Sequence, residues 1–353
     1  MTVQPVVQTQ PVPSRLGYRM PAEWEPHQAT WLAWPTDLKT WPEELKEVEA
    51  SYVEMVEALH LGEEVHLLVR DQTLREYVSG LLTNRGIKKN VFYHEVKTVS
   101  NWIRDYGPMF LVRGGSEMAY CGWRFNGWGG KCPAACADGE VPKQLAPLLR
   151  TLQFEPEMIL EGGSVEVNGA GMLMTTEQCL LNRNRNPNLN RSEIERFLND
   201  FFGVDRILWL GRGLAGDDTD GHVDTLARFV NVKTVVACTE ENQNDENYEV
   251  LRNNWDRLRH WKGLLNLVPI PMPGMVQNRT GRVPANYANF YIANTCVLVP
   301  QYEHPNDARA VEILRELFPK KKTVGISCIP LIYGCGGLHC ATQPQPAHSA
   351  SRK

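Results

Sequence analysis

Apolar and polar positions repeat along this chain in a fixed order: a short apolar run, an amphipathic segment with helical spacing, and a second apolar run. In the first copy the apolar runs are residues 30–34 and 64–69, and Leu45, Val48 and Tyr52 begin the apolar face of the segment between them. Each copy therefore predicts a strand, a helix and a strand. The other four copies comprise residues 117–121, 141–152 and 157–160; 171–175, 191–202 and 206–210; 234–238, 246–261 and 265–270; and 296–300, 307–318 and 323–328.

Local signals mark the ends of two predicted helices. Gly62 follows the first helix (residues 43–61) at the position of a C-cap, and Ser192 with Glu195 is placed like a capping box for the third. Strand–helix–strand units make parallel strand pairs with right-handed crossovers. Five of them predict an α/β fold in which similar modules form a closed ring. The sequence contains neither a GxGxxG fingerprint after a strand nor a GxxxxGK[ST] loop, which argues against a doubly wound nucleotide-binding sheet.

Composition places this ring in one globular domain, residues 18–345, with disordered tails expected at 1–17 and 346–353. The formal net charge is −4 and the isoelectric point is near 6.2, which argues against a nucleic-acid partner. No apolar run reaches the length of about 18 residues that a membrane span needs. The 9 cysteines are irregularly spaced and do not suit a secreted disulfide framework, so we expect a cytoplasmic protein. The sequence is silent on oligomeric state, and a homodimer is our expectation.

Chemically distinctive residues follow the closing strand of each unit. In open α/β sheets ligands bind beyond the carboxyl ends of the strands. By analogy, five such ends arranged round an axis would bring these side chains into one central site. The last segment also holds glycines beside a cysteine, and glycine allows a second group to approach the backbone closely. The candidate residues of this site are Trp102, Asp105, Glu161, Asp218, His222, Asp224 and Cys340.

Several of these residues have structural alternatives. Asp105 could form an ion pair with Arg104, and Glu161 could be a solvated carboxylate at a strand end. Cys340 could be a buried apolar residue, or half of a disulfide or metal pair with Cys335. His222 and Asp224 are two positions apart and would point the same way from an extended chain.

A metal site is not predicted. The acidic run from Asp217 to Asp220 lacks the Gly and Glu positions of an EF-hand calcium loop. Three residues separate Cys132 from Cys136, so the pair lacks the C-x2-C form of a zinc site, and it has no matching second pair. Zinc sites usually have three or four His or Cys ligands at recognisable spacing.

The combination of a thiol, an imidazole and three carboxylates narrows the chemistry. Thiol and imidazole are the nucleophile and base of thiol hydrolases. Ordinary amide hydrolysis develops an oxyanion, which surrounding carboxylates would repel. A planar guanidinium instead pairs bidentately with carboxylates. The pattern therefore predicts attack of a thiol on a guanidinium or amidinium carbon in a small cationic substrate.

The chain also resembles the agmatine deiminases, within the wider group that includes bacterial-type peptidylarginine deiminases. The resemblance runs from about Tyr18 to Gln345, nearly the whole chain. The matching stretches are residues 20–27 (MPAEWEPH), 31–35 (WLAWP), 102–108 (WIRDYGP), 125–130 (FNGWGG), 160–164 (LEGGS), 218–224, 286–294 and 336–343.

This resemblance implies the pentein fold, a five-bladed α/β propeller, and hydrolysis of agmatine to N-carbamoylputrescine and ammonia without a cofactor. It implies Cys340 as the nucleophile and His222 as the general acid and base. Asp105 and Asp224 would hold the guanidinium, with Glu161 assisting. Trp102 would line the substrate channel and Asp218 would lie near the amine tail of the substrate. His339 would support the turn.

Three alternatives stay open at this point. The family commonly has glycine where Cys335 stands and Asn where Thr225 stands, and the acidic run before His222 also differs, so specificity for the substrate tail is open. A deiminase of free or peptidyl arginine is one alternative, with Arg104, Arg279 and Arg282 as candidate partners of the substrate carboxylate. A non-catalytic binder of cationic metabolites and a thiol-based redox or metal sensor are the others.

Overall fold

The computed structural model describes residues 11–115 and 117–348, and in it the predicted units are built as separate small sheets. Apart from a two-stranded antiparallel sheet of β13 (Val276–Asn278) and β14 (Gly281–Val283), each sheet has a first strand antiparallel to the second, a second strand parallel to the third, and a helix in the crossover between the parallel strands. The first strand of each sheet was not predicted. Four sheets with their crossover helices are β4 (Met109–Arg113), β5 (Glu117–Cys121), α5 (Val141–Leu149), β6 (Leu152–Phe154); β7 (Glu166–Val167), β8 (Met172–Thr176), α7 (Arg191–Phe202), β9 (Arg206–Leu210); β10 (Ala227–Asn231), β11 (Thr234–Thr239), α8 (Tyr248–Arg259), β12 (Asn266–Pro271); and β15 (Tyr291–Ile292), β16 (Cys296–Gln301), α9 (Asn306–Leu317), β17 (Lys322–Ser327).

The remaining unit joins the two ends of the described chain. In this sheet β18 (Gln343–Pro346) pairs antiparallel with β1 (His27–Ala33), which is parallel to β2 (Glu64–Val69) across α1 (Leu45–Leu59). A second crossover, α2 (Gln72–Asn84), adds the parallel strand β3 (Val91–Glu95). The repeated parallel pairs confirm the α/β class and the strand–helix–strand units predicted from periodicity.

Three local predictions were wrong. The closing strand of the second unit is β6, whereas residues 157–160 contribute only an isolated bridge between Ile159 and Arg124. The capping box of α7 is formed by Asn190 and Glu193 rather than Ser192 and Glu195, because the Asn190 side chain is the one that reaches the free backbone N–H groups.

Gly62 is not a helix cap either, because α1 ends at His60 in an ordinary helical conformation. Its role is close approach. A Cβ at position 62 would lie 2.3 Å from the hydroxyl of Thr295, so only glycine allows the turn after α1 to pack there.

Residues 11–17 and 346–348 belong to the predicted tails, yet they lie within the described part of the chain. Residues 1–10 and 349–353 lie outside the described residues, but Pro13–Leu16 form a 3-10 helix that packs on α7, and Arg113 donates a hydrogen bond to the Leu16 carbonyl at 3.0 Å. At the other end, Pro346 is paired with His27 within the sheet. Packing against neighbouring elements explains why these residues are ordered despite their polar sequence.

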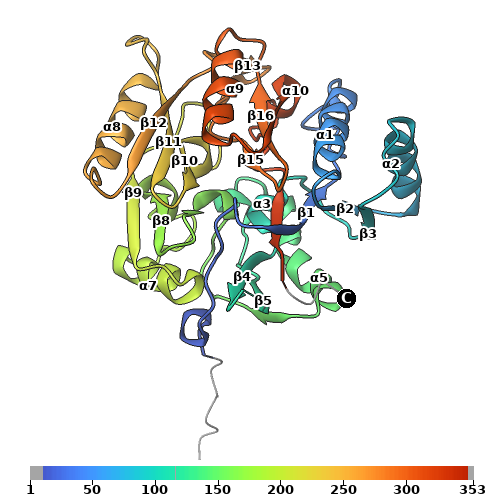
Figure 1. The fold of residues 1–353 in the computed structure, drawn as a ribbon, viewed down its shortest axis with the longest axis horizontal. Helices are drawn as coiled ribbons and strands as arrows, with labels where there is room; N and C mark the ends of the chain where they lie inside the picture. The colour runs from blue at the N-terminus through green and yellow to red at the C-terminus, as the bar shows by residue number, and fades with distance from the viewer. Residues whose placement is uncertain (1–10, 116, 349–353) are drawn as a thin grey trace, which may run out of the picture.

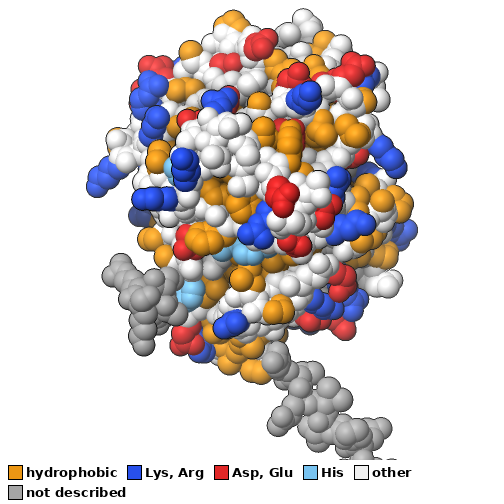
Figure 2. Space-filling view, turned by 90° about the vertical axis from the view of Figure 1, so that its right-hand side faces the viewer, with side chains coloured by type: hydrophobic (Ala, Val, Ile, Leu, Met, Phe, Trp, Pro, Cys, Tyr) orange, Lys and Arg blue, Asp and Glu red, His pale blue; other side chains and the backbone are white. Residues whose placement is uncertain are grey.

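The crossover helices lie on the outside and cover the sheets, while the short helix α3 (Ile103–Tyr106) lies near the middle of the molecule (Figure 1). The helices are held by their apolar faces: Val48, Tyr52 and Val56 of α1 are fully buried in the largest apolar cluster. Each such side chain contributes on the order of 1.5–3 kcal/mol. On the face shown in Figure 2, basic and acidic side chains are interspersed and form no large patch of one charge. Within the described residues, no helix is long and apolar enough to cross a membrane.

The polar segments highlighted by the sequence connect one sheet to the next. Residues 101–108 join β3 to β4, 161–164 join β6 to β7, 216–224 join β9 to β10, and 334–340 join β17 to β18. Three of these connections contact one another: α3 packs against the 3-10 helix Gly162–Ser164, which packs against the 3-10 helix Val223–Thr225. The fold therefore gives each sheet one connection to a shared site.

Candidate active site

Three charged side chains converge on the backbone of Gly163, which lies in the short 3-10 helix Gly162–Ser164. A Cβ at this position would lie 2.6 Å from His222 Nδ1, 2.9 Å from Asp105 Oδ1 and 3.0 Å from Asp224 Oδ2. His222 and Asp224 do not project from an extended chain as predicted: His222 caps the 3-10 helix Val223–Thr225, and Asp224 lies inside it. Because Gly163 has no side chain, Asp105, His222 and Asp224, which are up to 119 positions apart in the sequence, can all approach its backbone.

The Cys340 thiol lies beside this group. Its Sγ is 3.6 Å from Asp224 Oδ2, and the side-chain amide of Asn289 donates to Sγ at 3.3 Å. Gly337 makes the approach of Asn289 possible, because a Cβ there would lie 2.5 Å from Asn289 Oδ1. Burial, together with the carboxylates of Asp224 and Asp105, raises the pKa of Cys340 well above its usual range, so the thiol is protonated in the free protein.

Asp105 is held at both carboxylate oxygens. The indole N–H of Trp128 donates to Oδ2 at 2.8 Å, and the backbone N–H of Gly163 donates to Oδ1 at 2.9 Å. Burial, with a contribution from Asp224, raises the pKa of Asp105 despite the opposing effect of His222. Arg104 is not its partner: Arg104 pairs with Glu23 at 2.9 Å, so the alternative of a structural Arg104–Asp105 ion pair is wrong.

Glu161 is fully buried and paired with Arg185, whose Nε is 3.1 Å from Oε1, so it is not a solvated strand-end carboxylate. Arg185 is in turn paired with Asp220. Burial alone would raise the pKa of Glu161, but His222 and Arg185 outweigh it and the pKa is lowered. Glu161 is therefore ionised and already partly neutralised by a fixed cation.

His222 lies between two carboxylates without touching either. Its Nδ1 is 3.7 Å from Asp105 Oδ1 and its Nε2 is 3.7 Å from Glu161 Oε2, and neither ring nitrogen has a hydrogen-bond partner. Burial opposes the charged ring, but Asp105, Cys179 and Glu161 outweigh it and raise the pKa of His222 well above its usual range. The ring is thus an imidazolium that can donate a proton.

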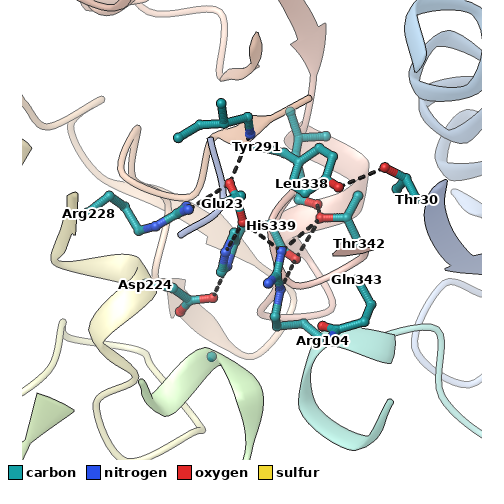
Figure 3. Close-up of polar contacts among 12 residues, drawn as sticks. Glu23, Thr30, Arg104, Asp224, Arg228, Tyr291, Leu338, His339, Thr342 and Gln343 are labelled. Carbon is teal, nitrogen blue, oxygen red and sulfur yellow. Dashed lines mark hydrogen bonds and ion pairs between the residues drawn. The ribbon is translucent and has the colours of Figure 1, made fainter. Parts of the chain in front are cut away.

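Asp224 is positioned from behind by a buried ionic network (Figure 3). His339 Nδ1 lies 2.7 Å from Asp224 Oδ2, and its Nε2 lies 2.9 Å from Glu23 Oε2. Glu23 also accepts from Arg228 at 2.7 Å and from Arg104 at 2.9 Å. Burial opposes ionisation of Asp224, but His339 and His222 outweigh it and lower the pKa of this carboxyl group. His339 therefore contacts Asp224 directly rather than only supporting the turn.

The two predicted substrate-contact residues lie at the periphery of this group. Trp102 packs its ring on the glycine-rich segment, where a Cβ at Gly336 would lie 2.7 Å from the ring. Asp218 is an exposed residue near Cys335, but the surrounding protein atoms limit hydration of its carboxyl group, and this desolvation together with Asp217 raises its pKa to about 6. Cys335 has a φ of 63°, a left-handed conformation that favours glycine, and all 9 cysteines are free, so Cys335 and Cys340 are not a disulfide.

A model of the Porphyromonas-type peptidyl-arginine deiminase family matches residues 19–346. The chain belongs to this family. An agmatine deiminase from Ectopseudomonas mendocina is 33% identical, with 94% of this chain and 96% of that protein covered. Among solved structures, the agmatine deiminase of Enterococcus faecalis has a TM-score of 0.88 at 30% identity, covering 96% of this chain and 98% of that one. A putative arginine deiminase from Porphyromonas gingivalis has a TM-score of 0.86 at 36% identity, covering 93% and 98%.

Sequence reasoning missed several residues of this deiminase-family site. Trp128 and Glu23 lie in stretches that carried the resemblance, but nothing in their spacing assigns them to Asp105 and His339. Asn289 and Arg185 sit in Asn- and Arg-rich loops, where composition alone does not single out one residue. Cys179 was also missed, because its helix, Glu177–Leu180, directly follows a buried strand and looks like core.

One group within the described residues could hold a metal ion. It consists of Glu161, Cys179 and His222, all buried, with ligand atoms within 4.8 Å of one another. It was not predicted, because its members come from three separate connections and have no recognisable spacing.

Proposed function

We propose that this chain is an agmatine deiminase, which hydrolyses agmatine to N-carbamoylputrescine and ammonia. The observation that supports this proposal most directly is the convergence of Asp105, Asp224 and His222 on Gly163, with the Cys340 thiol 3.6 Å from Asp224. Two buried carboxylates suit a planar guanidinium, since its N–H donors pair bidentately with carboxylates. Family membership and the agmatine deiminases among the relatives support the same reaction.

The proposed reaction has two halves. The Cys340 thiolate attacks the guanidinium carbon held between Asp105 and Asp224, and a C–S bond forms. His222 gives its proton to the departing nitrogen, the C–N bond breaks, and ammonia leaves an S-alkylthiouronium intermediate. The neutral His222 then takes a proton from water, whose oxygen attacks the same carbon. The C–S bond breaks, the hydroxyl proton passes to the departing Cys340 sulfur, and the neutral urea product is released with the thiol restored and His222 again protonated.

Substrate binding supplies the thiolate in this proposal. The pKa of Cys340 is raised by burial and by the Asp224 and Asp105 carboxylates. A bound guanidinium offsets the charge of these carboxylates, so it weakens their upward effect on the pKa of the Cys340 thiol. His222 already carries a proton and cannot accept another, so the thiol proton leaves through the neighbouring Asp224 oxygen or solvent. Glu161, with its charge shared by Arg185, orients His222 and stabilises its charged form.

Agmatine is favoured over arginine because the candidate partners of an α-carboxylate are already engaged. Arg104 is buried and paired with Glu23, as described above. Arg279 contacts Glu43 and Glu44 at 2.8 and 2.9 Å, and Arg282 contacts Asp245 at 2.9 Å. Asp218 and the Trp102 ring offer instead a carboxylate and an aromatic face, which suit the ammonium tail of agmatine.

An ammonia-release assay across agmatine, arginine and an arginine-containing peptide tests this assignment. We expect turnover of agmatine, and release from arginine alone would overturn the specificity. Cys340→Ser should abolish turnover, while its matched control Cys335→Ser should retain most of it. Asp105→Asn should lower kcat/KM by orders of magnitude, and an effect below about tenfold, roughly 1.4 kcal/mol, would mean that Asp105 is structural.

The finer features of the fold belong to the same proposal. We propose that the five sheets with parallel strands form a five-bladed α/β propeller, the pentein fold, within one domain around this site. Their shared topology and the pairing of β18 with β1 support a closed arrangement. A cytoplasmic homodimer remains our expectation, and analytical ultracentrifugation of the purified protein tests the dimer.

A further inference from the structure

A second thiol lies against His222, on the side away from Asp105. Cys179 belongs to the short helix Glu177–Leu180, which is fixed by Thr176: its hydroxyl accepts from the Cys179 backbone N–H at 3.2 Å and donates to the Gly221 carbonyl at 2.6 Å. Cys179 Sγ lies 3.9 Å from Glu161 Oε2 and is fully buried. The residue before His222 is thereby tied to the helix that carries this thiol.

We propose that Glu161, Cys179 and His222 form an inhibitory binding site for a divalent transition-metal ion of the zinc class. The three ligand atoms lie within 4.8 Å of one another, and all three side chains are buried. His222 Nε2 points into the group and has no hydrogen-bond partner. A buried polar atom without a partner is costly, and an ion at this position would satisfy it.

The distances are close to those that zinc requires. Tetrahedral coordination with Zn–N and Zn–O near 2.1 Å and Zn–S near 2.3 Å places neighbouring ligand atoms about 3.3 to 3.6 Å apart. The observed separations are 3.7 Å from His222 Nε2 to Glu161 Oε2 and 3.9 Å from Cys179 Sγ to the same oxygen. These two separations would each have to shorten by about 0.3 Å, and the third pair of ligand atoms, from Cys179 and His222, lies within 4.8 Å and must also close. The three side chains would then fill three positions of the tetrahedron and leave the fourth for water.

Arg185 does not block this site. Its closest contact to Glu161 is with Oε1, 3.1 Å from Nε. Nε also donates at 3.4 Å to Oε2, the oxygen that faces His222 and Cys179, so an ion would share Oε2 with this longer hydrogen bond. Its charge is also shared with Asp220. Such a paired guanidinium acts as a hydrogen-bonded support that orients the carboxylate, which is the usual arrangement behind a metal ligand.

Binding needs neutral His222 and the Cys179 thiolate, so one proton leaves each side chain for solvent as the ion enters. The ion then occupies the nitrogen that would otherwise be free to exchange protons, and it also engages Glu161. Inhibition rests on the proposed catalytic role of His222, whereas metal binding does not. The two claims are therefore tested separately.

Metal binding is tested with Co²⁺ as the probe, because thiolate ligation gives a charge-transfer band in the near ultraviolet. Titrations use the full chain carrying Cys132→Ser and Cys136→Ser, which removes the half-buried thiol of Cys132 and the exposed thiol of Cys136. We expect the band in this background and in the same chain with Cys340→Ser. We expect it to be lost with Cys179→Ser, and with Cys179→Ala as a second variant should the serine protein not fold.

Loss of the band with Cys340→Ser and its retention with Cys179→Ser would overturn the proposal, because the ion would then sit on the proposed nucleophile. Absence of the band from the background protein would also overturn it. In parallel, Zn²⁺ should inhibit ammonia release from agmatine, reversibly with EDTA. The half-inhibitory Zn²⁺ concentration should rise at least about tenfold in Cys179→Ser, since even indirect supports of a metal ligand contribute 10- to 100-fold in affinity. A Co²⁺ band without enzyme activity would support the metal site and refute the proposed function.

Discussion

Gly163→Ala places a methyl group at the centre of the proposed catalytic group, and its effect follows directly from the distances. The new Cβ would lie 2.6 Å from His222 Nδ1 and 2.9 Å from Asp105 Oδ1, where ordinary contact begins near 3.4 Å. His222 must therefore retreat by about 0.8 Å, and Asp105 by about 0.5 Å. Both side chains are buried, so neither can swing into solvent.

Catalytic geometry is sensitive on this scale: a misplacement of about 1 Å can cost on the order of 10²-fold in rate. Because two groups move at once, we expect Gly163→Ala to lower kcat/KM for agmatine by at least about 10²-fold. Steady-state ammonia release measures this, and thermal unfolding reports whether the chain still folds.

Gly80→Ala is the matched control. A Cβ there meets nothing within 4 Å, and the residue lies inside helix α2, where alanine is favoured over glycine. This variant should keep wild-type activity and be equally or more stable. A folded Gly163→Ala protein with kcat/KM within tenfold of wild type would refute the assignment of this point as the reaction centre.

Three further predictions concern the supports of the site. Trp128→Phe removes the 2.8 Å hydrogen bond to Asp105. A hydrogen bond to a charged group contributes about 1.5–3 kcal/mol, so kcat/KM should fall by roughly 10- to 100-fold. An unchanged kcat/KM would mean that the Gly163 N–H alone positions Asp105. Glu23→Gln removes the carboxylate partner of buried Arg104 and one of the two carboxylate partners of Arg228 and His339, and it should lower the free energy of unfolding in urea by about 3–5 kcal/mol. Burial opposes the ionised form of Glu23, but Arg228, His339 and Arg104 hold its pKa well below 4.5. The stability that ionised Glu23 contributes is therefore complete above its pKa in the unfolded chain and is lost as the pH falls through its pKa in the folded protein. The loss of unfolding free energy in Glu23→Gln should thus shrink in acid, and a loss that grows in acid would contradict this. The wild-type KM for agmatine should rise as the pH falls through about 6, because Asp218 takes up a proton there. In Asp218→Asn the KM should be high and independent of pH in this range. If the KM of both proteins changed with pH in the same way, Asp218 would have no role in binding the substrate.

The sequence by itself determined the repeated units and the order of the polar connections. Periodicity is local, since buried faces of helices and strands recur at fixed spacing in any fold, and this is why the parallel strands of each unit were predicted, apart from the misplaced β6. Two of the antiparallel first strands, β7 and β15, were missed because they have only 2 residues each, too few to show a period. β4 and β10 were missed although they have 5 residues each. The capping box of α7 was misplaced by two positions for a related reason: Asn190 and Ser192 are both good caps, and only the folded backbone selects one.

The chemistry of the site was also predictable in part, because Cys340, His222 and the acidic residues carry rare reactivity in motif-like segments. Only the tertiary structure decided how they are paired. In the folded protein Glu161 pairs with Arg185, and His339 contacts Asp224. The cysteine beside His222 is Cys179, which belongs to no spaced cysteine motif. These contacts join residues from different connections, so no spacing along the chain encodes them. Whether a buried charge is free to bind a substrate or already neutralised depends on such long-range pairs, and that is set by packing.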